Sequence, residues 1–258
     1  MPVAQRLLPQ GIADLVRQIL LFCGAYMLYR LVRGVVEGRA GAAFENARRV
    51  IRLEHHVGVF VEPAVQAWTV GTGSLIDVAS WLYVNCHFTV TVFTLAFIYL
   101  FRNEHFYFVR NMFMVSMAIA LVVYLLFPTA PPRMMSEWGF TDSVSDFTGV
   151  SSDSSISALF NPYAAVPSMH VCFALMLGVP MARMARHGWS RAIWALYPAL
   201  VTYVVIATAN HWIFDAATGA LTATASALAA QQLFGRARPQ AWAWQPEALP
   251  APAPVQAA

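Results

Sequence analysis

Six apolar stretches of this chain approach the roughly 20 residues that an α-helix needs to cross a bilayer. They cover residues 15–36, 75–101, 108–127, 168–184, 193–209 and 211–234. The composition supports this interpretation, because 59% of the 258 residues are apolar and only 11% are charged, against about 25% charged residues in soluble domains. The sequence therefore predicts an all-α integral membrane protein with six transmembrane helices.

Residues 42–70, between the first two stretches, are too polar to insert. Apolar residues recur there every three or four positions, which is the pattern of amphipathic helices that lie in the membrane interface. Charged residues occupy many of the other positions: Glu45, Arg48, Arg49, Arg52 and Glu54. We expect these interfacial helices to be broken near Gly58 and Pro63.

The composition excludes several functional classes. The chain contains no lysine, which rules out lysine Schiff bases and Walker-type phosphate loops. Its formal charge of +3 is small and dispersed, so we expect no nucleic-acid partner. Cys23, Cys86 and Cys172 lie singly in apolar stretches without metal-ligand spacing. Nothing in the sequence requires a metal or another cofactor.

We expect three segments along the chain. Residues 1–40 hold the first span, residues 41–234 form one catalytic core, and residues 235–258 form a Pro- and Ala-rich tail that we expect to be disordered. Within the core, the longest polar stretch is 128–167, which contains a serine-rich patch and a single basic residue, Arg133. A loop of this length inside a compact domain is usually functional.

The arginines suggest an orientation. With a cytoplasmic N-terminus and six alternating spans, most loop arginines fall on the cytoplasmic side, as the positive-inside rule favours. The arginines of residues 42–70 fall on the other side, where interfacial helices use arginine to contact headgroups. We therefore expect a bacterial cell-membrane protein whose site lies on the extracytoplasmic face. Its oligomeric state stays open.

Three short fragments carry the reactive side chains. They are Pro131-Pro132-Arg133 after the third stretch, Pro167-Ser168-Met169-His170 at the start of the fourth, and His211-Trp-Ile-Phe-Asp215 at the start of the sixth. Strict alternation of six spans places all three fragments at the same membrane face. We therefore expect one site at this face that contains a guanidinium, a histidine beside a hydroxyl, and a His/Asp pair.

These residue types suit phosphate chemistry. His211 and Asp215 are four apart on a helix, so their side chains share one face. A carboxylate that binds one ring nitrogen fixes the tautomer and leaves the other nitrogen as a nucleophile. Ser168 is placed to cap a helix whose N-terminus presents free amides to a phosphate, and Arg133 adds a permanently charged clamp.

Other polar residues in or near the spans have two interpretations. Asn85 and His87 lie inside the second stretch, where they serve either hydrogen bonding between helices or a supporting role at the site. Asn210, next to His211, is a further supporting candidate. The remaining histidines are interpreted as interfacial polar residues: His55, His56, His105 and His187.

The fragments resemble the type 2 phosphatidic acid phosphatase superfamily. That family carries a Lys-x6-Arg-Pro motif, a Pro-Ser-x-His motif and a Ser-Arg-x5-His-x3-Asp motif on a six-helix membrane core. Pro167-Ser168-Met169-His170 matches the second motif, and His211-x3-Asp215 matches the end of the third.

Two of the motifs are incomplete. Leu126 and Met134 stand where the first motif has Lys and Pro, and Val204 and Val205 stand where the third has Ser-Arg. These departures resemble one branch, the inositol phosphorylceramide synthase-like inositolphosphotransferases. The resemblance includes the Pro-Pro-Arg turn, Asn161-Pro-Tyr-Ala-Ala-Val-Pro-Ser-Met-His170 and Ala-Thr-Ala-Asn-His211, and it covers residues 54–234.

The resemblance implies a metal-independent mechanism with a role for each residue. His211 attacks phosphorus and becomes phosphohistidine, while Asp215 orients it and stabilises the imidazolium. His170 protonates the leaving oxygen and then activates the incoming hydroxyl or water. Arg133 and Ser168 hold the nonbridging oxygens.

Several functions remain open. The preferred one is a lipid phosphatase or phosphotransferase that acts on a phospholipid or a polyprenyl phosphate. An inositolphosphotransferase differs only in using an alcohol instead of water to attack the intermediate. A membrane protein that binds lipid headgroups without catalysis is a second class, although binding alone does not need both an acid and an oriented nucleophile. A transporter is a third, although no interrupted helices in matching halves are visible.

Overall fold

The computed structural model describes residues 8–149 and 163–234, and their regular structure is helical apart from one isolated bridge between Thr129 and Ala164. Five helical spans are long and apolar enough to cross a membrane: Gly11–Val32, Leu75–Phe101, Asn103–Leu126, Gly188–Ala207 and Ile213–Gln232. The predicted all-α integral membrane fold is confirmed. The fourth predicted span corresponds to Met169–Met184, a shorter apolar helix of 16 residues, so the count of six stays a prediction.

The helices follow the predicted order. The elements are α2 (Gly11–Glu37), α3 (Ala40–Val57), α4 (Glu62–Gly71), α5 (Leu75–Trp81), η1 (Leu82–Cys86), α6 (His87–Phe101), α7 (Asn103–Leu126), η2 (Pro132–Met134), η3 (Ser136–Trp138), α8 (Ser143–Thr148), α9 (Met169–Met184), α10 (Gly188–Ala207), α11 (Ile213–Leu228) and η5 (Ala229–Phe234). The second span is continuous through η1, a π-helical turn that joins α5 to α6.

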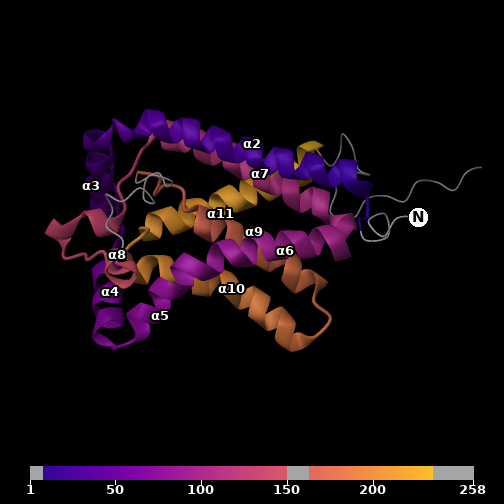
Figure 1. Cartoon of the computed structure of the whole chain (residues 1–258). Coiled ribbons are helices and arrows are strands. Elements are labelled where there is room, and N and C mark those ends of the chain that lie inside the picture. Colours follow the sequence, from indigo (N-terminus) through magenta and orange to yellow (C-terminus); the bar gives the residue numbers. More distant parts are fainter. Residues whose placement is uncertain (1–7, 150–162, 235–258) are drawn as a thin grey trace, which may run out of the picture.

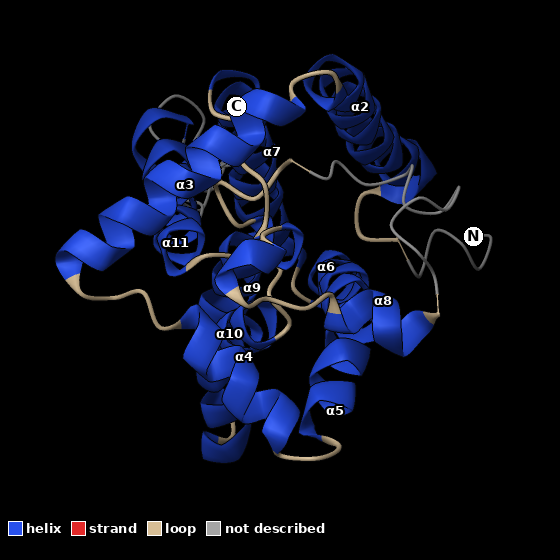
Figure 2. Cartoon of the chain, turned by 90° about the vertical axis from the view of Figure 1, so that its left-hand side faces the viewer, coloured by secondary structure: helices blue, strands red, loops and turns tan. Residues whose placement is uncertain are grey.

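Two helices lie across one end of the bundle. In Figure 1, α3 and α4 run roughly perpendicular to α2, α7, α11 and α6. Figure 2 views the molecule from this end, with α3 and α4 in front of the bundle. The predicted break between them is present, because Gly58 ends α3 with a left-handed φ of 73° and Pro63 lies in the first turn of α4.

One expectation about α3 is wrong. The sequence pattern placed Glu54 among the charged residues of a polar face, yet its side chain is only 1% exposed. The N-terminus of α11 packs over this position, and the amide of Phe214 donates to Glu54 Oε1 at 2.7 Å. Free amides at a helix start need acceptors, and here a carboxyl of another helix supplies one.

Close helix contacts depend on small residues. A Cβ at Gly178 of α9 would lie 2.7 Å from the backbone oxygen of Trp194 in α10. A Cβ at Gly219 of α11 would lie 2.4 Å from the backbone oxygen of Ser168, at the start of α9. Glycine at these two positions lets α9 approach both neighbours closely, as is common between membrane helices.

The first span is held at the end of the bundle away from α3. Asp14 of α2 accepts hydrogen bonds from the hydroxyls of Tyr99, at 3.2 Å, and Tyr107, at 2.9 Å. In Figure 1, α2 lies alongside α7 over most of its length. The predicted disordered tail and the serine-rich patch of residues 151–155 lie outside the described residues.

Candidate active site

The three predicted fragments meet at the end of the bundle that α3 and α4 cover. His170 Nδ1 lies 3.2 Å from His211 Nε2, and the amide of Arg133 donates to the backbone oxygen of Ala209 at 2.8 Å. The fragments come from the starts of α9 and α11 and from the loop after α7. Two imidazoles and a guanidinium thus share one location, although they are up to 78 residues apart in the chain.

A tight turn between α10 and α11 positions His211. The amides of Asn210 and His211 both donate to the backbone oxygen of Val205, at 2.9 and 3.1 Å. Ala209, at the corner, has a positive φ of 54°, which is uncommon for a residue with a Cβ. The next residue, Trp212, is fully buried and its indole donates to the backbone oxygen of Ala130 at 3.0 Å. The backbone on both sides of His211 is therefore fixed.

The hydrogen bonds of His211 define its tautomer. Its Nδ1 lies 3.1 Å from the backbone oxygen of Ala165 and 3.2 Å from Asp215 Oδ2. Because a backbone oxygen only accepts, Nδ1 carries the hydrogen and Nε2 presents a lone pair. Burial and the charge of Arg133 lower the pKa of His211 to about 3, so the ring is neutral at physiological pH. A neutral ring with a directed lone pair is the form that attacks phosphorus.

Asp215 is fully buried, and its side chain contacts two groups that directly precede α11. Besides His211, its Oδ2 accepts from the amide of Trp212 at 2.9 Å. Its backbone oxygen accepts from the amide of Ser168 at 3.0 Å, which ties the start of α11 to the start of α9. One residue therefore orients the ring of His211 and links the start of α11 to the start of α9.

Changing Asp215 to Asn should separate these two roles. An Asn side chain still accepts from the Trp212 amide, so we expect the protein to fold. Asn carries no negative charge to stabilise the positive charge that His211 acquires on attack, and we expect the turnover rate to fall roughly 10²- to 10⁴-fold without reaching zero. Steady-state kinetics of the purified variant, with its thermal midpoint as a folding control, measures this. An unchanged rate would remove Asp215 from the site.

Arg133 lies in the 3-10 turn η2 with its guanidinium between two partners. Its Nη1 donates to Asn210 Oδ1, and its Nε lies 3.8 Å from Asp142 Oδ2. The side chain keeps 24% of its surface exposed, which leaves room for a further anion. Asn210, a predicted supporting residue, thus contacts the guanidinium and neighbours His211. The sequence did not single out Asp142, since one acid in a long acidic loop has no distinguishing pattern.

Ser168 is the N-cap of α9, as the sequence predicted. Its Oγ accepts from the amide of Val171 at 3.4 Å, and the residue is fully buried. The cap directs the start of α9, and with it His170, toward His211. The free amides of the first turn of α9 lie beside the same two histidines.

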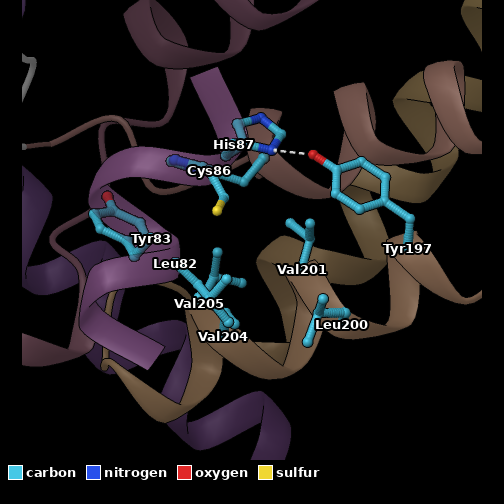
Figure 3. A pocket seen from close by; sticks show the side chains of 10 residues that line it. Leu82, Tyr83, Cys86, His87, Tyr197, Leu200, Val201, Val204 and Val205 are labelled. Atoms are coloured by element: carbon cyan, nitrogen blue, oxygen red, sulfur yellow. Dashed lines mark hydrogen bonds between the residues drawn. The ribbon is translucent and has the colours of Figure 1, made fainter. Parts of the chain in front are cut away.

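The two polar residues of the second span have different surroundings. The ring of His87 lies 4.8 Å from that of His170, and its Nδ1 lies 3.3 Å from the hydroxyl of Tyr197 (Figure 3). Asn85 is exposed and donates to the backbone oxygen of Trp81 within its own helix at 3.0 Å. The structure therefore brings His87 to the site and leaves Asn85 on the outer surface of the span.

An apolar pocket leads up to His170. It lies between η1 and α10, and Figure 3 shows Tyr197 reaching across it toward His87. Val204 and Val205, where the family's third motif has Ser-Arg, contribute to its wall. Tyr83, which the sequence did not single out, packs its ring 5.0 Å from that of His170. An aromatic residue in an apolar span gives no signal that separates such a position from ordinary packing.

Most of this chain matches the model of a known protein family. Residues 48–229 match the model of a family described as the PAP2 superfamily. The matched range begins in α3, ends in η5 and contains every site residue described above. Neither the curated proteins nor the solved structures gave a significant match.

Proposed function

Because this chain belongs to the PAP2 superfamily, and is in general terms a membrane phosphatase or phosphotransferase, we propose that it cleaves a lipid phosphoester through a phosphohistidine on His211. The substrate class is a phospholipid or a polyprenyl phosphate. The observation that carries the proposal is the fixed tautomer of His211, whose Nδ1 is bound by Ala165 and Asp215 while Nε2 points at His170.

The first half-reaction begins when a phosphate enters between the two imidazoles. The lone pair of His211 Nε2 forms a bond to phosphorus as the bond from phosphorus to the lipid oxygen breaks. His170, protonated beside the anionic phosphate, gives one proton to that leaving oxygen and becomes the neutral ring. Asp215, 3.2 Å from His211 Nδ1, stabilises the positive charge that the phosphorylated ring acquires.

The second half-reaction reverses the proton transfer. His170, now unprotonated, takes a proton from water or from an alcohol, whose oxygen then attacks phosphorus. The bond between phosphorus and Nε2 breaks, and its electron pair returns to His211. Throughout, Arg133 is the guanidinium placed to balance the charge on the nonbridging oxygens, with Asn210 and Asp142 holding it in place.

The position of the site supports a lipid as the substrate. The histidines lie at the starts of α9 and α11, His170 lines an apolar pocket, and α3 and α4 cross this end of the bundle (Figure 1). A phosphate at headgroup level and an alkyl chain along the span fit this arrangement. We propose that this end faces the extracytoplasmic side of a bacterial cell membrane.

An inositolphosphotransferase is the second candidate. The observation that favours it is the replacement of Ser-Arg by the buried pair Val204 and Val205, which is a feature of that branch. In this version the hydroxyl of inositol replaces water in the second half-reaction and the product is an inositol-phosphate lipid. A protein that only holds lipid headgroups is the alternative from another class.

A lipid screen resolved by headgroup separates these functions. We expect the purified protein to turn over at least one phosphorylated lipid, releasing phosphate if water attacks and a new phosphodiester if added inositol attacks. Turnover should be unchanged by EDTA, because no group of three or more His, Cys, Asp or Glu side chains in the described parts of the chain is arranged to hold a metal ion. Binding of lipid without either product would support the headgroup-binding alternative.

A further inference from the structure

The start of α11 is bound by three carboxyl groups from three different elements. Its first amides donate in sequence order: Trp212 to Asp215 Oδ2 at 2.9 Å, Ile213 to Glu62 Oε1 at 2.8 Å, and Phe214 to Glu54 Oε1 at 2.7 Å. Glu54 belongs to α3 and Glu62 to α4. The two interfacial helices thus supply acceptors for the helix that follows the nucleophile.

All three carboxyls are removed from water. Glu54 is 1% exposed, and Glu62 and Asp215 are fully buried. Their second oxygens, Glu54 Oε2, Glu62 Oε2 and Asp215 Oδ1, accept from no amide, hydroxyl or basic group within the described residues. A helix N-terminus offers about half a positive charge, which cannot balance three buried negative charges.

A shared proton resolves this imbalance. Glu54 and Glu62 accept from the neighbouring amides of Phe214 and Ile213, so their two carboxyl groups lie close together. Two close, buried carboxyl groups cannot both ionise, so one proton stays on the pair. The pair then carries a single negative charge against the start of α11. This is the arrangement seen wherever two close carboxylates cannot both ionise.

We propose that Glu54 and Glu62 form a proton-sharing acid pair that positions His211 and Asp215, and that loss of the shared proton switches the site off. The expected loss of activity rests on the proposed function, whereas the acid pair itself does not. Neither glutamate touches the reacting atoms, so both are positioning residues. Their effect passes through the amides of Ile213 and Phe214 to the turn that holds His211.

The surroundings of Glu54 set the pH at which the proton leaves. Burial, together with the neighbouring carboxyl group of Glu62, raises the pKa of Glu54 from 4.5 to about 9. The ionisable groups that face it are Glu62 from α4 and Asp215 from α11, both of which raise the value, while the Phe214 amide lowers it. At neutral pH the proton is in place.

The direction of the pH effect follows from this shift. The unfolded chain loses the proton near 4.5, and the folded protein keeps it to about 9. The contribution of the pair to stability is therefore fully present below 4.5 and is lost progressively as pH rises to about 9. Activity should fall as pH passes the upper value, roughly tenfold per pH unit for a single proton.

Glu54→Gln tests the pair, with Glu45→Gln as the matched control. The new amide side chain keeps an oxygen for the Phe214 amide and an N–H for Glu62, but it does not titrate. Glu45 lies on the same helix, exposed and paired with Arg49 and Arg52. We expect Glu54→Gln to move the alkaline limb of the pH–rate profile up by at least about one unit and to flatten the fall of the thermal midpoint with pH. Glu45→Gln should behave as wild type.

Infrared spectroscopy reads the proton without activity. Wild type and Glu45→Gln should show the carbonyl stretch of a protonated carboxyl that disappears as pH rises through about 9, and Glu54→Gln should lack it. If Glu54→Gln does not fold, Glu62→Gln should give the same results, since the proton is shared. An unchanged infrared signal or thermal profile in the folded variants overturns the pair. An unchanged alkaline limb overturns the switch, and absence of any lipid turnover in wild type overturns only the proposed function.

Discussion

Replacing His211 with Gln is expected to lower turnover by roughly 10⁴-fold or more, because the variant lacks the nitrogen lone pair that is placed to form a bond with phosphorus. Gln has a side chain of similar length and can still donate to the backbone oxygen of Ala165, so the turn before α11 should persist. Wild type incubated with a substrate carrying radiolabelled phosphate should form an acid-labile, alkali-stable phosphoprotein. The variant should form none.

His187→Gln is the matched control for this experiment. His187 precedes α10, is exposed and stacks only on Trp189 among the described aromatic rings, so its loss should leave both turnover and labelling unchanged. Membrane insertion and the thermal midpoint should be equal in wild type and both variants. Wild-type turnover in His211→Gln, or labelling that persists in it, would overturn the assignment of the nucleophile.

Replacing His170 with Ala should divide the reaction into its two halves. With an alkyl phosphoester, whose leaving oxygen needs a proton, we expect the rate to fall by about 10²- to 10⁴-fold. With a nitrophenyl ester, whose leaving group departs without a proton, His211 should still become phosphorylated. The phosphoenzyme should then accumulate, because no base remains to activate water.

Two measurements check this division. A burst of nitrophenolate equal to the amount of protein, followed by slow release of phosphate, is expected for His170→Ala and not for wild type. Labelled protein should reach one phosphate per chain. Equal losses on both esters without a trapped intermediate would show that His170 has no role in proton transfer, and its contact with His211 would then be structural.

The sequence predicted those features that depend on local pattern. Apolar length identified the spans, and alternation of the spans brought Arg133, His170 and His211 to one end of the membrane helices. The spacing of His211 and Asp215 predicted their contact, but the reason was wrong: His211 lies before α11 and not on it. Asp215, in the first turn of α11, reaches back to His211 as it does to the amide of Trp212. The break between α3 and α4 followed from Gly58 and Pro63, which have strong backbone preferences.

Features set by contacts between distant elements were not predictable. Glu54 was placed on a polar face, because an amphipathic pattern cannot show that another helix will start above it. Asn85 and His87 are two residues apart in one apolar span, and only the packing of α10 against η1 decides which of them meets His170. Asp142 reaches Arg133 from a loop without periodicity.

The hydrogen bonds that α3 and α4 make to the start of α11 have a consequence for swapping segments between relatives. The first span carries none of the site residues, is secured by tyrosines at the remote end, and lies before the matched range of residues 48–229. It is therefore a replaceable anchor, and a foreign span should be accepted there. The stretch from α3 to α4 must instead be transplanted together with α11, since a chimera that mixes the two would break the carboxyl contacts that hold the start of α11.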